Sequence, residues 1–132
     1  MEDHISNIPV YLILIFTLIT FLQSGLDKIF DWKGNSGWLT GHFEGTFMGG
    51  MVPFLLGIIL ILEVITGILA IVGMATLFLN NDPTYSLWAL IIAALTLLML
   101  LFGQRVAKDY AGAFTIVGYF IVIIFGVFLL TA

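Results

Sequence analysis

The chain has 132 residues, of which 61% are hydrophobic and 9% are charged, and its mean hydropathy is +1.19. An ordinary soluble domain is about 45–50% apolar and about 25% charged. The composition therefore excludes a soluble enzyme and a disordered linker, and it indicates an integral membrane protein. The lack of cysteine excludes disulfides, thiolate metal sites and iron–sulfur clusters. A net charge of −4 with four basic residues argues against nucleic acid as a partner.

Four apolar runs are long enough to cross a bilayer as helices, because a hydrocarbon core of about 30 Å needs about 20 residues. The runs cover about residues 8–27, 51–79, 84–103 and 110–131. They lack the alternation of barrel strands, and a helix satisfies its own backbone groups in lipid. The sequence therefore predicts a single transmembrane domain over residues 1–132, an all-α four-helix bundle.

Two of the three connections are short. Residues 80–84 and 104–109 leave room only for tight turns, which predicts antiparallel hairpins between the second and third spans and between the third and fourth. Pro83 suits the start of a helix, with Asn81 or Asp82 as its cap.

The connection between the first two spans is longer, and it is rich in glycine and tryptophan. Leu39, Phe43 and Phe47 recur every four residues, which predicts a short interfacial helix with one apolar stripe. An irregular loop is the alternative, because each of its glycines weakens a helix by about 1 kcal/mol relative to alanine.

The basic residues predict the orientation of the spans. They fall in the first and third loops only: Lys28, Lys33, Arg105 and Lys108. The positive-inside rule then places these loops in the cytoplasm and both termini outside. The stretch Met1–His4 is acidic and lacks the basic region of a signal peptide, so we expect the first span to be retained.

Glu63 lies near the middle of the second span, where a carboxylate is costly without a partner, so it is expected to face inward. It is either a proton carrier or quinone head-group contact, or a polar contact that locks two helices together. Lys28 pairs with it directly only if the first helix runs deeper or the second begins earlier than the spans suggest. Gln23 and Ser24 are the nearer hydrogen-bond partners.

The remaining polar residues suggest little chemistry. Charged residues cluster at the end of the first span and in the third loop: Asp27, Lys28, Asp31, Arg105, Lys108 and Asp109. They either lie solvated at helix ends or form a cytoplasm-facing network that binds an acidic partner or an anionic head group. His4 and His42 fall on opposite faces of the membrane in this topology, which excludes bis-histidine haem ligation within one chain, and no metal site is predicted.

Small and aromatic residues mark two kinds of surface. Small residues in the second and third spans predict close helix packing: Thr66, Gly67, Ala70, Gly73, Ala89 and Ala93. Large apolar residues at helical spacing form a ridge on the last span, which faces lipid, a prenyl chain or another membrane subunit: Phe114, Val117, Ile121, Phe125 and Phe128.

Three features occur together in this chain: Ser-Gly-Leu-Asp-Lys with Gly25 and Lys28, the long first loop, and Glu63 followed by Gly67 and Gly73. In these features the chain resembles the DoxX-like family of small four-span membrane proteins. The resemblance implies a bacterial inner (cytoplasmic) membrane location and quinone-linked or respiratory neighbours, without implying a particular reaction.

Three functions compete at this point. The leading one is a non-catalytic accessory subunit that packs against a larger, plausibly respiratory, membrane complex, because the chain offers much apolar surface and few chemical groups. The alternative is a quinone-interacting oxidoreductase subunit in which Gln23, Lys28 and Glu63 contact the head group and a partner supplies the redox centre. A small-molecule carrier is the third, and it fits poorly with four spans that lack repeats or broken polar helices. No intrinsic cofactor is expected beyond a bound quinone or lipid.

Overall fold

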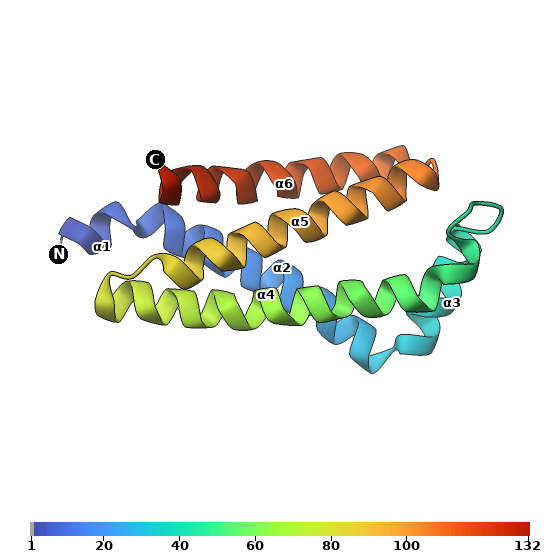
Figure 1. Ribbon diagram of the computed structural model, residues 1–132, viewed down its shortest axis with the longest axis horizontal. Coiled ribbons are helices and arrows are strands. Elements are labelled where there is room, and N and C mark those ends of the chain that lie inside the picture. Colours follow the sequence, from blue (N-terminus) through green and yellow to red (C-terminus); the bar gives the residue numbers. More distant parts are fainter. Residues whose placement is uncertain (1) are drawn as a thin grey trace.

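The computed structural model describes residues 2–132, and Figure 1 shows that they form a bundle of helices. In chain order the elements are α1 (Glu2–Ser6), α2 (Ile8–Phe30), α3 (Trp32–His42), the 3-10 turn η1 (Gly49–Met51), α4 (Val52–Asn80), α5 (Thr84–Val106) and α6 (Tyr110–Thr131). Helices α2, α4, α5 and α6 are long and apolar enough to cross a membrane. The predicted all-α four-helix membrane bundle is confirmed, and the protein is a multi-pass membrane protein. Met1, the first residue of the acidic stretch noted above, lies outside the described residues.

The helix ends follow local chemistry. Asn81 ends α4 in the left-handed conformation, with φ of 52°. The Asp82 carboxylate accepts the Thr84 N–H at 3.0 Å at the start of α5, and this hydrogen bond holds the pKa of Asp82 below its ordinary value. Asp109 caps α6 by accepting the Gly112 N–H at 2.9 Å. Pro83 occupies the N-cap position of α5 without a side-chain hydrogen bond, so the prediction of Asn81 or Asp82 as the cap of this helix is wrong, whereas both predicted tight turns are present.

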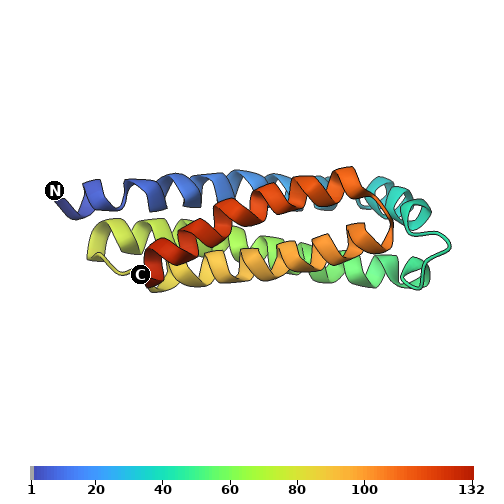
Figure 2. The same ribbon diagram turned by 90° about the horizontal axis from the view of Figure 1, so that it is seen from above.

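The four long helices form a ring in the order α2, α4, α5, α6, and α6 returns to α2. Figure 2 shows both chain ends at one end of the bundle, beside the turn between α4 and α5. The first loop and the turn between α5 and α6 lie at the other end. We call these the terminal end and the loop end.

The packed core fills the half of the bundle nearest the terminal end. Its members are Val10, Ile13, Leu14, Phe21, Ala70, Leu77, Ala89, Leu90, Ala93, Ala94, Leu97 and Ile123. The predicted small-residue seam is part of this core, since Ala70, Ala89 and Ala93 are fully buried where α4 and α5 approach each other. Toward the loop end the two helices diverge, as Figure 1 shows, so this hairpin has the form of a wedge.

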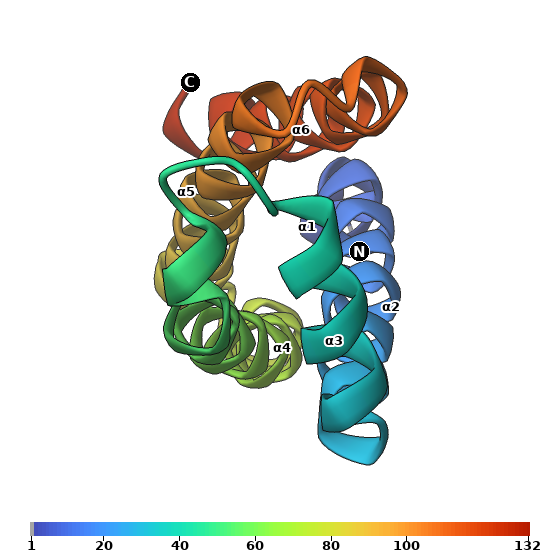
Figure 3. The same ribbon diagram turned by 90° about the vertical axis from the view of Figure 1, so that its right-hand side faces the viewer.

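A helix forms in the first loop, but it ends before the predicted stripe is complete. The Asp31 carboxylate caps α3 by accepting the Gly34 N–H at 3.2 Å, and the helix stops at His42. Residues 43–48 are irregular because Gly45 has a φ of 82° and the Thr46 hydroxyl donates back to the Phe43 carbonyl at 2.7 Å. The prediction of one helical face through Leu39, Phe43 and Phe47 is therefore wrong beyond His42. In Figure 3, α3 lies across the loop end of the ring.

Candidate functional site: an ion pair beside a cavity

A buried ion pair joins the first and second spans. The Glu63 side chain is 2% exposed on α4, and Lys28 Nζ from α2 lies 2.8 Å from its Oε1. The same ammonium donates to Ser24 Oγ at 2.7 Å, while the Ser24 carbonyl oxygen is a weaker contact at 3.4 Å. Beyond the ammonium, Glu63 Oε1 has no hydrogen-bond partner among the described residues. The charges compensate each other inside a largely apolar bundle.

The pair forms because α2 and α4 cross at a glycine. A Cβ placed on Gly25 would lie 3.9 Å from the Glu63 Cβ, so α2 passes Glu63 less than one turn before Lys28. Helix α4 has 29 residues and is about 44 Å long, more than the bilayer core, and its first turns extend past this crossing. The depth argument from the sequence assumed that both spans begin at the same level. That assumption is wrong, and the direct pair follows.

Of the three residues proposed for a head-group contact, the structure brings two together. Ser24, the other expected partner of Glu63, contacts Lys28 instead. Gln23 is exposed on the outer side of α2, where it borders a shallow groove with Leu22 and Leu26. It therefore stands apart from the ion pair.

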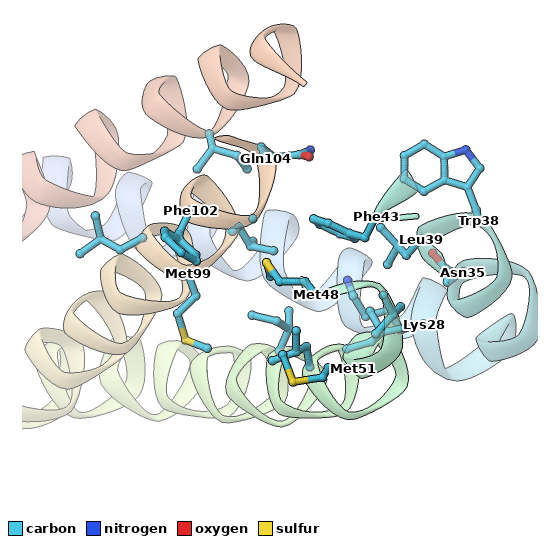
Figure 4. A pocket seen from close by; sticks show the side chains of 18 of the residues that line it. Lys28, Asn35, Trp38, Leu39, Phe43, Met48, Met51, Met99, Phe102 and Gln104 are labelled. Atoms are coloured by element: carbon cyan, nitrogen blue, oxygen red, sulfur yellow. The ribbon is translucent and has the colours of Figure 1, made fainter. Parts of the chain in front are cut away.

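A cavity of about 870 Å³ occupies the loop-end half of the bundle. Its walls come from α2, α3, residues 43–48, α4, α5 and α6, and we call it the wedge cavity. Figure 4 shows Met99 and Phe102 reaching into it from α5, with Met48 and Met51 on the side of α4 and Lys28 at its end nearest α2. Of the described residues that line the cavity, Lys28 is the one that carries a charge.

Amides supply the other polar groups of the wall. The Asn35 amide donates to the Asp31 carbonyl at 2.9 Å and to the Asp27 carbonyl at 3.2 Å, which leaves its oxygen as an acceptor. Gln104 accepts a hydrogen bond through Oε1, with His42 Nε2 at 2.9 Å. The site is therefore apolar with a few hydrogen-bonding groups, as small-molecule sites usually are.

Contacts between the two loops at this end run through His42. Its Nε2 lies 3.6 Å from Asp109 Oδ2 in addition to the Gln104 contact, and its ring stacks on Trp38 with centroids 4.7 Å apart. Arg105, which the predicted charge network groups with the residues at the end of the first span, lies over the Tyr110 ring instead. His4 stacks on a phenylalanine at the terminal end, so the two histidines lie at opposite ends of the bundle, as predicted.

The methionines of the sequence are a signal for the cavity, but a hydropathy scale does not distinguish them from other apolar residues. Met48, Met51 and Met99 all line the wall. Methionine side chains are flexible and polarisable, and they adapt to irregular apolar ligands. Two of the three methionines belong to the glycine-rich first loop or lie next to it. Methionines clustered at such a loop therefore distinguish this region from an ordinary lipid-facing helix.

Comparison of the chain with protein-family models, with curated proteins and with solved structures gives no match. The resemblance to DoxX-like proteins therefore stays an expectation that depends on the residues quoted for it.

Proposed function

We propose that this protein is a non-catalytic membrane component that holds a long-chain amphiphile with an uncharged head group, of the lipoquinone type, in the wedge cavity. The observation that carries the proposal is the position of Lys28, whose ammonium stands between buried Glu63 and an otherwise uncharged wall. The apolar chain packs against the methionines and leucines of α4 and α5.

The ion pair favours an uncharged head group. Lys28 has three N–H donors; it donates to Ser24 Oγ, and its ammonium forms an ion pair with Glu63 Oε1 at 2.8 Å. A head-group carbonyl accepts a further N–H. An anionic head group would leave a net negative charge in a medium of low dielectric, where isolated charges are costly.

The chain's own groups at the cavity bind and orient the ligand. Lys28 donates to the head group, and the Asn35 side-chain oxygen is positioned to accept from a hydroxyl. Electron transfer to or from such a ligand belongs to a partner subunit.

The ligand is tested by purification from native membranes in mild detergent, followed by solvent extraction and mass spectrometry. We expect a lipoquinone with the wild type and about ten-fold less with the Lys28→Met/Glu63→Met variant, since a hydrogen bond to a charged group contributes about 1.5 kcal/mol or more. The double change removes the donor without leaving an unpaired charge.

Gln23→Leu is the matched control. It removes a polar group at a similar level of α2 but on the outer side, and it should retain the ligand as the wild type does. Equal retention by the wild type and the double variant, or extraction of no amphiphile from either, contradicts the proposal.

A second candidate function is an accessory subunit of a larger, respiratory membrane complex. The observation that favours it is the outward ridge of α6, on which Phe114, Ile121, Phe125 and Phe128 are each more than half exposed. Other integral membrane subunits are partners of suitable chemistry for such a face. The same mild-detergent preparation tests this role. Stable co-purifying subunits support it, and a protein that purifies alone contradicts it.

We place the protein in a bacterial inner membrane with the loop end in the cytoplasm. The four basic residues all lie in or beside the connections at that end. The positive-inside bias therefore acts on one end only.

The orientation is tested with topology reporters. A reporter fused after Ala132 should read outside, and one inserted in residues 104–109 should read inside, because all the Lys and Arg residues favour the cytoplasmic side. Exchanging the four basic residues for glutamine should weaken this preference. Reversed reporter signals in the wild type contradict it.

A further inference from the structure

We propose that the wedge cavity opens sideways into the bilayer between α4 and α5, so that its ligand enters from the membrane leaflet at the loop end and not from water. The proposal depends on the proposed function for the identity of the ligand. The opening itself follows from which residues line the cavity and which of them are exposed.

The wall on α5 is also part of the outer surface of the bundle. Four of its residues line the cavity and are 41% to 58% exposed: Leu95, Leu98, Met99 and Phe102. Across the opening, Met51 at the N-cap of α4 lines the cavity and is 43% exposed. A side chain that belongs to both surfaces borders an opening, and all of these side chains are apolar. The opening therefore faces lipid.

The opening is tall enough for a hydrocarbon chain. The lining of α4 runs from Met51 to Ile59, which is about 12 Å along the helix. The lining of α5 runs from Leu95 to Gln104, about 13 Å. A slot of this height covers somewhat less than half of a bilayer core of about 30 Å. Figure 4 shows Met99 pointing across it toward α4.

The end that faces water is partly covered. Helix α3 and residues 43–48, which we call the roof, lie over part of the ring, and two of their large apolar side chains, Trp38 and Phe47, line the cavity while being 64% and 69% exposed. His42 holds the roof to Gln104, and the Phe43 ring packs so closely on Gly103 that a Cβ there would lie 3.4 Å from it. Thr46 ties the loop together, accepting the Met48 N–H at 3.2 Å and donating to the Phe43 carbonyl. These contacts hold the roof to α5, and the side of the roof that lines the cavity is apolar apart from the Asn35 amide.

The Lys28–Glu63 pair lies on the α2 side of the cavity, and fully buried Thr66 follows Glu63 about one turn further along α4. An amphiphile that enters sideways therefore meets the ammonium with its head group and leaves its chain toward the slot. The lateral route and the position of Lys28 together favour a ligand that is dissolved in the membrane.

The experiment uses tryptophan fluorescence of the full chain in vesicles of phosphatidylcholine with brominated acyl chains, which quench on contact. Trp32, Trp38 and Trp88 are changed to phenylalanine, and one reporter is introduced as Ile59→Trp or Ile61→Trp. Ile59 lines the cavity and is 7% exposed, whereas Ile61 is 60% exposed on the outer side of the same helix. The two positions differ in depth by about 3 Å, so depth does not separate them.

We expect brominated lipid to quench the two reporters to within about two-fold of each other, since their depths match. Acrylamide, a quencher dissolved in water, should quench the Ile59→Trp reporter less than half as strongly as it quenches protein that retains only Trp38 in the roof. Adding Leu98→Phe and Met99→Phe should narrow the slot with ring volume and reduce lipid quenching of the Ile59→Trp reporter by about two-fold, with no change for Ile61→Trp.

Stronger quenching of the Ile59→Trp reporter by acrylamide than by lipid overturns the proposal in favour of entry from water. Quenching by neither agent overturns it in favour of a closed cavity. If the reporter does not fold, Ile59→Cys and Ile61→Cys replace it, because the chain contains no other cysteine. A bilayer-soluble pyrenyl maleimide should then label both and a charged water-soluble maleimide neither, and failure to label Ile59→Cys contradicts the lateral slot.

The proposed function and the lateral slot can be contradicted independently of each other. Lipid quenching at Ile59→Trp together with no extractable amphiphile supports the slot and contradicts the function. An extracted lipoquinone together with water access at Ile59→Trp supports the function and contradicts the slot.

Discussion

Replacing Lys28 with methionine is expected to lower the free energy of unfolding by about 3 kcal/mol, because removing one partner of a buried pair leaves the other charge uncompensated. Glu63 is 2% exposed and Oε1 has no partner among the described residues apart from the ammonium. In the variant it must either stay charged in an apolar site or take up a proton. Both outcomes cost stability relative to the pair.

The reverse change should cost less. In Glu63→Met the ammonium of Lys28 keeps Ser24 as a partner, and its side chain is 13% exposed toward the cavity, so it can turn away from the vacated site. We expect a loss of about 1 kcal/mol, the scale of one hydrogen bond. The Lys28→Met/Glu63→Met variant should return to within about 1 kcal/mol of the wild type, because apolar replacement of a whole pair is often neutral.

The measurement is a double-mutant cycle in mixed micelles, with unfolding by a denaturing detergent followed by fluorescence. Gln23→Met is the control for a polar residue on the outer side of the same helix and should be near neutral. Losses that simply add in the double variant would show that the two side chains do not interact in the folded protein.

Most of the fold could be predicted from hydropathy, because a bilayer imposes a length and a polarity on every span. The observed helices begin within one residue of the predicted starts at 8, 51, 84 and 110. The first and third helices each end three residues later than predicted, at Phe30 and Val106. These helices continue into polar residues because their backbone hydrogen bonds form outside the bilayer core as well as inside it. Hydropathy therefore marks the end of the apolar run and not the end of the helix.

The site was less predictable, because it depends on how helices cross. Sequence identifies Glu63 as a residue that needs a partner, but its partner follows from the close approach of α2 and α4 at Gly25. The cavity depends on the divergence of α4 and α5, which hydropathy does not encode. The sequence predicts an irregular glycine-rich loop only as the alternative to a helix, and it does not single out Gly45 as the residue with positive φ. The spacing of Leu39, Phe43 and Phe47 suits a helical stripe as well as three lining residues of a cavity.

The narrow end of the wedge, where Gly73 of α4 meets Ser86 of α5, should tolerate added volume least. We call this place the apex. A Cβ on Gly73 would lie 2.7 Å from the Ser86 nitrogen and 2.8 Å from both its Cα and its Oγ, so the new atom meets backbone as well as the hydroxyl. We expect Gly73→Ala to lower the free energy of unfolding by about 2 kcal/mol, since overpacking typically costs 1–3 kcal/mol. The helix propensity of alanine offsets part of the clash.

Two variants separate the clash from other effects of the substitution. Gly118→Ala places a Cβ in open space on α6, so it should keep or slightly raise stability. Ser86→Ala removes a buried hydroxyl that has no partner among the described residues, and it should be close to neutral by itself. Because two of the three close contacts are with the Ser86 backbone and remain when the hydroxyl is removed, the Gly73→Ala/Ser86→Ala variant should stay destabilised.

Gly73→Ala should also alter the width of the cavity if α4 and α5 act as a wedge. Forcing the helices apart at Gly73 requires one of them to shift, and packed helices transmit such shifts along their length. Lipid quenching of the Ile59→Trp reporter should therefore change in Gly73→Ala but not in Gly118→Ala, with the unfolding titration measured on the same samples. Wild-type stability together with unaltered quenching in Gly73→Ala would show that the apex relaxes locally and does not set the width of the slot.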